Sequence, residues 1–436
     1  MKKHTQSPCE RSEISYKPSG IEWLGEIPQS WENVSIRSCF TESNQRCNTD
    51  SYPLLSVTIA NGIIYQDNIE NKKDISNDDK SNYKIVPLNA VAYNKMRMWQ
   101  GAVGVNTLTT GIVSPAYIVA IPNEKILPNF VSYLFKSKIM IGEFDKNSYG
   151  LCLDMNNLRY DDFRNIKIPL PPLQEQKEIA EFLDKKCEKI QNYINKKQKL
   201  ITLLQEKKQA LINEVITKGL NPNIEFKNSG IEWLGEIPKH WEVKKIKYIY
   251  KSINGFTPDT SNASYYDNFN GYDWITISDI NKKYVNESEV KVSQKYIDKF
   301  HPQVTPKGSL LYSFKLSVGL VAFAKKDIYT NEAVLSFLNT NDVDLNFLYY
   351  SSFLIQFNAK ENIYGAKLLN KELINNAFMV FPPLQEQKEI AEFLDSKVAQ
   401  INSVIEKTKK QIELVKEYKN TLINEAVCGR INLERK

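Results

Sequence analysis

The sequence predicts a mixed α+β protein, in which two α/β domains are joined by two long antiparallel helices in a pseudo-twofold arrangement. Three observations predict this class. Two blocks of sequence occur twice, a long heptad-patterned segment follows each copy of one block, and short β-type runs fill the segments between the blocks. With 436 residues, of which 42% are apolar and 25% charged, the chain is long enough to bury more than one core.

The repeated blocks set the domain organisation. Residues 16–32 (YKPSGIEWLGEIPQSWE) return as residues 226–242 (FKNSGIEWLGEIPKHWE). Residues 171–184 (PPLQEQKEIAEFLD) return unchanged as residues 382–395. The repeat distance is far longer than that of a solenoid, and each copy is long enough to be a domain. The sequence therefore predicts a tandem duplication.

The segments between the blocks are similar in length but agree in almost no register, so two like frames carry two unlike inserts. We name the first repeated block the strap, and expect its tryptophans to pack on the domain that follows. The predicted parts are a first strap (1–32), a first insert (33–170), a first long helix (171–217), a linker with the second strap (218–242), a second insert (243–381), and a second long helix with a tail (382–436).

Each long helix is predicted from its apolar spacing. Apolar residues recur at steps of three, four and seven, which is typical of a coiled coil. A span of roughly 42 residues gives a length of about 60 Å, and Gly219 and Gly429 are expected to end the helices. We expect the two helices to pair antiparallel within one chain; a coiled coil between chains is the alternative. The predicted seam residues are Ile179, Phe182, Leu183, Ile190, Ile194, Leu204, Leu211, Ile390, Leu394, Ile401, Ile405, Ile412, Val415 and Leu422.

The inserts are predicted to mix strands and helices. Short runs rich in Val, Ile, Tyr and Phe, bounded by Asn, Asp, Gly or Pro, indicate strands. The expected strands are 52–59, 90–93, 111–121, 274–277, 309–314 and 318–323, and the expected helices are 130–138 and 345–360.

Composition excludes several kinds of site. The formal charge of +6 is compatible with a polyanionic partner but does not require one. Six cysteines without a CxxC pair and three histidines lack metal-ligand spacing, so no metal site is expected. No segment has the apolar length of a signal peptide or a membrane span. We expect a cytoplasmic protein with reduced thiols and no membrane partner.

Each insert contains a cluster of basic, polar and aromatic residues. Arg, Lys, Asn, Gln and Ser reach phosphates and base edges, and aromatic neighbours can stack on bases. Such clusters also occur on ordinary solvated strand edges. The candidate DNA contacts are Lys95, Arg97, Trp99 and Gln100 in the first insert and Ser313 and Lys315 in the second.

The paired PPLQEQKEIAEFLD blocks, each opening a helix that contains LINE near its end, and the paired SGIEWLGEIP straps closely resemble the specificity subunit of type I restriction-modification enzymes. The resemblance covers essentially the whole chain. Residues 95–102 with 111–117, and 312–319 with 330–333, are similar to two kinds of target recognition domain. Tyr149 and Tyr364, each followed by glycine, resemble a loop of such domains and join the candidate DNA contacts.

The resemblance implies a non-catalytic subunit that reads a bipartite, asymmetric sequence in double-stranded DNA through two target recognition domains. It implies two modification subunits, which methylate adenine N6, and restriction subunits as partners. No cofactor is expected in this chain, whereas S-adenosylmethionine, ATP and Mg are expected in the partner subunits. Because protein dimensions set half-site spacing on DNA, one heptad inserted in either helix is expected to change the spacer and not the half-site sequences.

The sequence leaves three alternatives to compare with this function. A coiled-coil scaffold that holds two protein-binding domains apart would show no sequence-dependent DNA affinity. The double prolines, as in Leu170-Pro171-Pro172-Leu173, lack the flanking polar and aromatic residues of an adenine methyltransferase loop. Asp259 with Glu289 and Lys291 has a spacing that a PD-ExK nuclease would tolerate, but the pattern is loose and the first insert lacks it.

Overall fold

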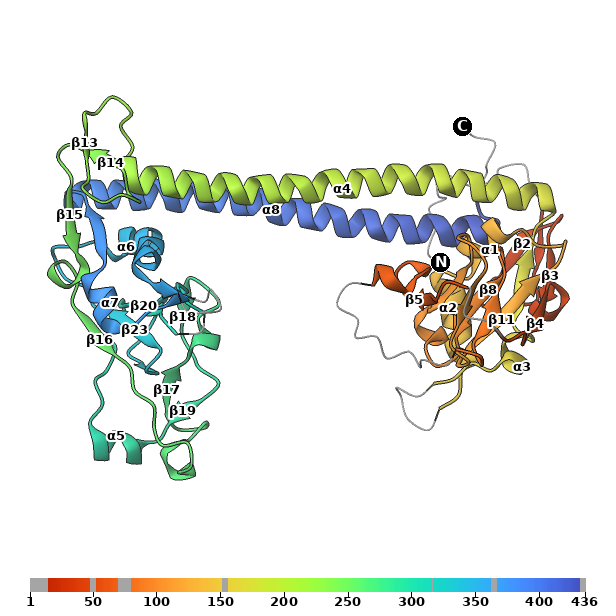
Figure 1. The fold of residues 1–436 in the computed structure, drawn as a ribbon, viewed down its shortest axis with the longest axis horizontal. Coiled ribbons are helices and arrows are strands. Elements are labelled where there is room, and N and C mark those ends of the chain that lie inside the picture. Colours follow the sequence, from red (N-terminus) through yellow and green to blue (C-terminus); the bar gives the residue numbers. More distant parts are fainter. Residues whose placement is uncertain are drawn as a thin grey trace, which may run out of the picture. The chain divides into compact units, whose positions relative to one another are not determined.

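The computed structural model describes residues 15–47, 52–69, 80–150, 156–315, 317–361 and 367–431. Helices and strands are mixed throughout, which confirms the predicted fold class (Figure 1). The chain divides into unit 1, made of residues 1–198 and 409–436, and unit 2, made of residues 199–408. Both long helices, α4 (Leu173–Lys218) and α8 (Leu384–Val427), contribute to both units.

The two straps fold alike. In unit 1, β1 (Tyr16–Pro18) pairs with β2 (Glu26–Pro28), and in unit 2, β13 (Phe226–Asn228) pairs with β14 (Glu236–Pro238) in the corresponding antiparallel register. The next strand of each strap pairs with the strand that leads into a long helix. These pairs are β3 (Glu32–Ser35) with β12 (Lys167–Leu170), and β15 (Glu242–Lys245) with β26 (Phe378–Phe381).

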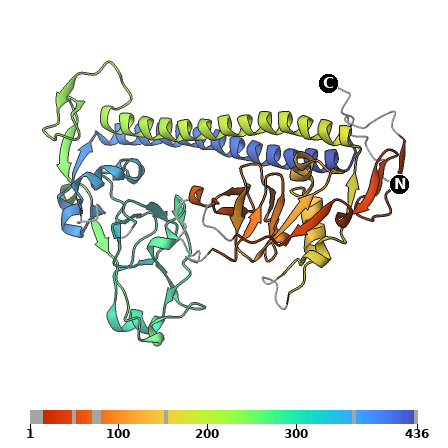
Figure 2. The ribbon, with the colours of Figure 1, turned by 45° about the vertical axis from the view of Figure 1, so that its right-hand side comes forward.

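The insert of unit 1 is built around an antiparallel four-stranded sheet, which lies among the strands and short helices that precede α4 (Figure 2). In sheet order its strands are β4 (Phe40–Ser43), β11 (Tyr117–Pro122), β8 (Val91–Asn94) and β9 (Val103–Val105). Two further pairs are β5 (Leu55–Thr58) with β6 (Gly62–Tyr65) and β7 (Lys84–Val86) with β10 (Gly111–Val113). The short helices are α1 (Pro128–Leu134), α2 (Lys138–Lys146) and α3 (Tyr160–Phe163).

The insert of unit 2 has a different sheet. Its five strands, in order, are β16 (Ser252–Asn254), β23 (Val334–Phe337), β20 (Leu310–Ser313), β21 (Val321–Ala324) and β18 (Tyr284–Val285). A second sheet contains β19 (Lys291–Val292), β17 (Tyr272–Ile275) and β22 (Tyr329–Thr330), and β24 (Lys360–Glu361) pairs with β25 (Lys367–Leu368). The helices are α5 (Gln294–Phe300), α6 (Leu345–Ser351) and α7 (Lys371–Asn376).

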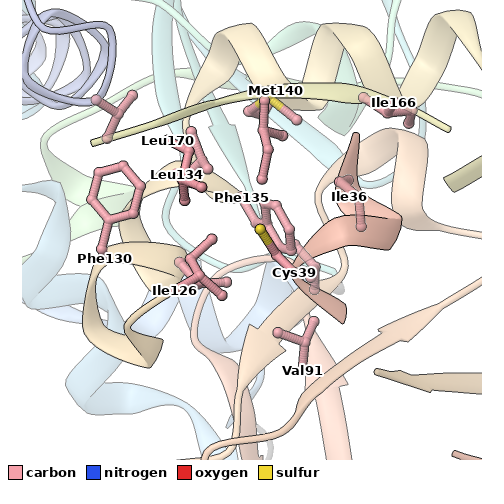
Figure 3. Close-up of a cluster of buried hydrophobic side chains, with 14 of the residues drawn as sticks. Ile36, Cys39, Val91, Ile126, Phe130, Leu134, Phe135, Met140, Ile166 and Leu170 are labelled. Atoms are coloured by element: carbon pink, nitrogen blue, oxygen red, sulfur yellow. The ribbon is translucent and has the colours of Figure 1, made fainter. Parts of the chain in front are cut away.

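The core of each unit combines its insert with parts of both long helices. In unit 1, the cluster around Phe130, Cys39 and Val91 (Figure 3) also contains Ile179 of α4 and Leu422 of α8. In unit 2, the core contains residues from the end of α4 and the start of α8, namely Val215, Ile216, Ile390 and Leu394. Within each unit, α4 and α8 therefore lie side by side and antiparallel, as the sequence predicts.

The long helices contain 46 and 44 residues, slightly more than the predicted span. α4 ends directly before Gly219 and α8 ends two residues before Gly429, and both glycines adopt left-handed φ values, of 73° and 76°, that other residues rarely take. Among the described residues, no helix is both long and apolar enough to cross a membrane.

Three predicted insert elements are divided in the structure. The expected strand 111–121 is interrupted after Val113 by a turn in which the Tyr117 N–H donates to the Ser114 carbonyl. The expected helix 130–138 ends at Leu134, and a new helix, α2, begins where the Ser137 hydroxyl accepts the Met140 N–H. The expected helix 345–360 ends as α6 at Ser351 and continues as a 3-10 helix, Ser352–Asn358.

Candidate functional site

Each unit contains the same hydrogen bond between a buried tryptophan of its strap and a half-buried glutamate at the start of a long helix. In unit 1 the Trp31 indole N–H donates to Glu175 Oε2 at 2.8 Å, and in unit 2 the Trp241 indole N–H donates to Glu386 Oε2 at 2.8 Å. Both tryptophans are fully buried. Because a buried indole N–H needs an acceptor, the half-buried carboxylate satisfies it in each unit.

The same tryptophans also contact the end of the second helix in their unit. A Cβ added to Gly219 would lie 3.1 Å from the Trp241 ring, and one added to Gly429 would lie 3.1 Å from the Trp31 ring. The glycines therefore serve two purposes: they end the helices, and they let an indole approach the backbone closely. Each tryptophan joins the start of one long helix to the end of the other.

A buried glutamine fastens the start of α4 to the insert of unit 1. Gln176 is fully buried, and its Oε1 accepts the Leu127 N–H at 2.7 Å. Its Nε2 donates to the Lys125 carbonyl at 3.0 Å and to the Pro171 carbonyl at 2.8 Å. One amide thus satisfies backbone groups on both sides of the junction, which we call the glutamine clamp.

The second copy of the block forms an equivalent clamp in unit 2. Gln387 is fully buried, its Oε1 accepts the Asp344 N–H at 2.9 Å, and its Nε2 donates to the Pro382 carbonyl at 2.9 Å. The accepted N–H lies just before α6, as Leu127 lies just before α1. The two unlike inserts are therefore attached to the frame in the same way.

A third repeated contact joins a tyrosine of the insert to the end of the PPLQEQKEIAEFLD block. The Tyr133 hydroxyl donates to Asp184 Oδ1 at 2.5 Å, and the Tyr350 hydroxyl donates to Asp395 Oδ1 at 2.5 Å. Burial first, and the adjacent carboxylate second, raise the pKa of both tyrosines well above the ordinary value, so both remain protonated donors. In unit 2 the Lys283 ammonium also pairs with Asp395 at 2.5 Å.

The apolar spacing of the block predicts no role for these polar residues. The missed residues are Glu175, Gln176, Asp184 and their counterparts in the second copy. A signal was present: these polar positions are identical in both copies although they lie outside the apolar seam. The partners could not be identified from sequence, because Trp31 and Glu175 lie 144 positions apart in the chain.

The fourteen predicted seam residues are all buried or half-buried. Ile194, Ile405 and Ile412 are each at most 5% exposed. Those near the helix starts, such as Ile179 and Ile390, also belong to the unit cores. In unit 2 the Lys208 ammonium reaches across to Asn402 Oδ1 at 3.2 Å.

Four predicted DNA contacts lie together in unit 1, in the turn between β8 and β9. We call residues 95–101 the recognition turn. Met98 anchors it with a fully buried side chain, whereas Arg97 and Gln100 are exposed and Lys95 and Trp99 are half-buried. The turn is ordered by its own hydrogen bonds, including that from the Trp99 indole to the Met96 carbonyl at 3.1 Å. The ordered backbone of the turn therefore presents the exposed side chains of Arg97 and Gln100 from fixed positions.

The predicted contacts in unit 2 are placed differently from one another. Ser313 is fully buried, and its hydroxyl donates to the Ser317 carbonyl and accepts the Leu320 N–H within the β20–β21 turn. Since that hydroxyl is used inside the protein, we do not retain Ser313 as a contact. Lys315 is exposed, and its ammonium lies 3.7 Å from Glu332 Oε1.

The two tyrosines singled out by resemblance differ in what the structure describes. Tyr149 is 65% exposed, and its backbone pairs with that of Asn157 through two hydrogen bonds. Tyr364 lies outside the described residues. The structure thus presents one exposed aromatic ring at the end of the unit 1 insert.

One residue that sequence analysis did not select is the most exposed of the large apolar side chains in the described part of the chain. Phe269 is 92% exposed. Its turn is rigid, because Asp267 Oδ1 accepts the N–H groups of both Phe269 and Asn270, at 3.1 and 3.0 Å. Asn268 Oδ1 accepts the Lys291 N–H at 3.0 Å and holds the turn on β19. A single exposed apolar side chain is ordinary on a protein surface, so its exposure alone assigns no role to Phe269.

In the structure, Asp259 of the nuclease alternative is hydrogen-bonded within its own turn. Asp259 Oδ1 accepts the N–H and the hydroxyl of Ser261 in its own turn. In the part of the chain that the structure describes, no group of three or more His, Cys, Asp or Glu side chains is placed to hold a metal ion.

One family of known proteins matches this chain in two segments. The family described as type I restriction modification DNA specificity domain matches residues 28–205 and 238–414. A putative type I restriction enzyme MjaX specificity subunit from Methanocaldococcus jannaschii is 26% identical, over 94% of this chain and 96% of its own length. The type I restriction enzyme EcoKI specificity subunit from Escherichia coli K12 is 20% identical, over 72% of this chain and 68% of its own length.

Two solved structures share the fold. A chain from a study of complex assembly and conformational transition of the type I R-M system has a TM-score of 0.71 at 17% identity, covering 93% of this chain and 99% of its own. The HsdS subunit from Thermoanaerobacter tengcongensis has a TM-score of 0.56 at 17% identity, covering 93% and 98%.

Proposed function

Because this chain belongs to the type I restriction-modification DNA specificity family, as a specificity subunit with two target recognition domains, we propose that each unit reads one half of a bipartite, asymmetric DNA target. Members of the family are non-catalytic, carry no cofactor of their own, and assemble with other restriction-modification subunits and DNA. The nuclease and scaffold alternatives are therefore set aside.

The observation that carries the proposal is the repetition of three junction contacts around two unlike inserts. The Trp–Glu contact, the glutamine clamp and the Tyr–Asp contact occur in both units, whereas the main sheets differ in strand number and order. We assign residues 33–170 and 243–381 as the two target recognition domains. Like frames present equivalent surfaces to like partners, and unlike inserts read unlike half-sites.

In unit 1, the proposed contacts are on the recognition turn and at Tyr149. Arg97 and Gln100 are exposed and have the donors and acceptors that read guanine and adenine edges in the major groove. Lys95 is suited to a phosphate, which positions the protein without reading sequence. Trp99 supplies a half-buried aromatic face beside them.

In unit 2, the proposed contacts are Lys315 and the Phe269 turn, with Tyr364 retained from the resemblance. Phe269 can pack against a thymine methyl or a base face, while the flanking Asn268 and Asn270 are both exposed. The Lys315 ammonium is suited to a phosphate, and the amides of Asn268 and Asn270, on either side of the exposed ring, are suited to base edges.

We further propose that two modification subunits bind the two frames and transfer a methyl group to adenine N6, and that restriction subunits join this assembly. S-adenosylmethionine, ATP and Mg are then used by those partners. The long helices set the distance between half-sites, because a continuous helix has a fixed rise per residue.

The test is single-molecule methylation sequencing of host DNA with the gene intact and with the gene deleted. The expected result is a split, asymmetric N6-methyladenine motif with a fixed nonspecific spacer that disappears on deletion. Exchanging only residues 33–170 for the insert of a relative should then change one half of the motif. A motif that survives the deletion, or that changes in both halves after the exchange, would overturn the proposal.

A further inference from the structure

The Lys136 side chain joins two loops of unit 1 that are far apart in the sequence. Its ammonium donates to the carbonyls of Thr58 and Ile59 at 3.2 and 2.7 Å, and to the carbonyl of Gly101 at 3.0 Å. The first carbonyl belongs to the last residue of β5, the second to the residue that follows it, and the third closes the recognition turn. An ammonium has three N–H donors, so the three carbonyls use its full capacity.

The same two loops are also joined by a close contact between the backbones of β6 and β9. Gly62 begins β6 and Gly104 lies in β9, directly after the recognition turn. A Cβ on Gly104 would lie 2.9 Å from the Gly62 Cα and 2.7 Å from the Ile63 N atom. Only glycine fits there without a shift, so the β5–β6 hairpin is seated on the strand that leaves the recognition turn.

The far end of the recognition turn is also fixed. Gly101 has a left-handed φ of 88°, and a Cβ there would lie 2.8 Å from Ile141 Cδ1 of α2. The turn therefore lies close against α2, and Lys136, which precedes α2, links it to the hairpin.

The hairpin tip, residues 59–61, presents unused side chains beside the recognition turn. Ile59 is 48% exposed, and Ala60 and Asn61 are also exposed. The tip keeps its shape because the Thr58 hydroxyl accepts the Asn61 N–H at 3.0 Å and donates to the Gly62 carbonyl at 3.2 Å. An isoleucine can contact a thymine methyl, and an asparagine can bind the adenine edge with two hydrogen bonds.

We propose that the hairpin tip, through Ile59 and Asn61, is a second base-reading element of the first target recognition domain, and that Lys136 is a positioning residue that holds it in register with the recognition turn. The inference rests on the proposed function of unit 1. DNA is the occupant because the tip is held against the turn that carries Arg97 and Gln100.

The test uses the full chain assembled with its modification subunits, and duplexes that carry the methylation motif with single base pairs replaced in either half. Asn61→Ala should lower discrimination at one base pair of the half read by unit 1 by roughly 5- to 150-fold, the usual range for one bidentate base contact. Discrimination in the other half should stay unchanged. Asn61 is at an exposed tip, so this variant tests the contact without disturbing a core.

Lys136→Met should lower discrimination at the base pairs read by both the tip and the recognition turn. Lys136→Arg should restore part of it, since a guanidinium also donates to several carbonyls. Lys138→Met is the matched control, because Lys138 is exposed two residues away and should behave as the wild type. A merely structural lysine would change the thermal midpoint and overall affinity, with the pattern of base discrimination intact.

With Arg97→Ala added to the set of variants, three outcomes are distinguished. If Arg97→Ala alters discrimination in the unit 1 half-site and Asn61→Ala does not, the second reading element is refuted while the proposed function stands. If Asn61→Ala alters discrimination but Lys136→Met matches Lys138→Met, the positioning role is refuted. If neither Arg97→Ala nor Asn61→Ala changes any base preference, both the proposed contacts and this inference are wrong.

Discussion

Replacing Gln176 by leucine removes the glutamine clamp of unit 1 at nearly constant side-chain volume. The amide makes three hydrogen bonds to backbone groups on either side of the junction. Each bond lost in a buried site leaves a partner unsatisfied and costs on the order of 1 kcal/mol or more. Gln176→Leu should therefore destabilise unit 1 by about 3 kcal/mol.

Gln387→Leu is the corresponding change in unit 2, where the structure has two such bonds. The same arithmetic gives about 2 kcal/mol, confined to unit 2. The matched controls are Gln174→Leu and Gln385→Leu, because these glutamines are not buried and each donates to a glutamate one turn away at 2.8 Å. Such helix-surface pairs contribute about 0.2–0.5 kcal/mol.

Scanning calorimetry and hydrogen exchange measure the effect together. For a unit of this size, about 1 kcal/mol shifts the thermal midpoint by roughly 2–4 °C, so Gln176→Leu should lower the unit 1 transition by about 6–12 °C. The Leu127 amide should exchange about two orders of magnitude faster, since it loses its acceptor. The Asp344 amide in unit 2 should be unaffected by Gln176→Leu and accelerated by Gln387→Leu.

The reasoning is refuted if Gln176→Leu and Gln174→Leu unfold within about 1 °C of each other, a gap too small for three buried bonds. It is also refuted if Gln176→Leu accelerates exchange at Asp344 as much as at Leu127, because the clamp would then not be local to its own unit.

Three further predictions concern DNA recognition. Inserting seven residues into both α4 and α8 adds about 10 Å to each helix at 1.5 Å per residue. The spacer of the methylated motif should then lengthen by about three base pairs of 3.4 Å, and both half-sites should stay unchanged. A new half-site with the old spacer, found by methylation sequencing, would contradict this prediction. Phe269→Ala should weaken binding through the unit 2 half-site by roughly 5- to 150-fold, the effect of removing a ring that stacks on a base. Phe300→Ala is the aromatic control, because it removes a half-exposed ring that packs on Tyr296. Equal effects of the two variants on binding to a series of duplexes would show that the Phe269 turn has no special role. Burial lowers the pKa of Lys136 to about 8, and no charged side chain of the described residues contributes to that shift. A neutral amine has only two N–H donors for its three uncharged carbonyl partners, so discrimination in the unit 1 half-site should fall as the pH rises through about 8 and should be flat in Lys136→Met. Because the pKa is lowered on folding, the unfolded chain binds this proton more tightly, so the contribution of Lys136 to the free energy of unfolding increases between about pH 8 and 10.5. A loss of discrimination in that window is therefore not caused by unfolding driven by Lys136. Identical pH profiles for the wild type and Lys136→Met would contradict the prediction.

Local sequence was sufficient for the elements whose patterns extend over many residues. The seam of α4 and α8 follows from apolar spacing alone, because a helix repeats every 3.6 residues wherever it lies in a protein. The helix ends at Gly219 and Gly429 follow from the left-handed backbone that glycine accepts. Short elements were less predictable. Proline after Ser114 favours a turn inside 111–121, and the apolar run across it conceals the break.

The candidate site shows the same division. Residue type selected both Ser313 and Lys315, and only the fold shows that one is enclosed in a turn while the other is exposed. Phe269 was not selected, because an isolated phenylalanine in a sequence is expected to be buried. Its exposure depends on a turn in which Asp267 accepts the N–H groups of Phe269 and Asn270.

By itself, the sequence determined that the protein has two like frames with unlike inserts, since identical blocks of residues must form identical local structure. The tertiary structure decided what those blocks do. Trp31 meets Glu175, Gln176 meets Leu127, and Lys136 meets Thr58, each across dozens of residues or more. Such pairings arise from burial and from the need to satisfy every buried polar group, and these conditions exist only once the chain has folded.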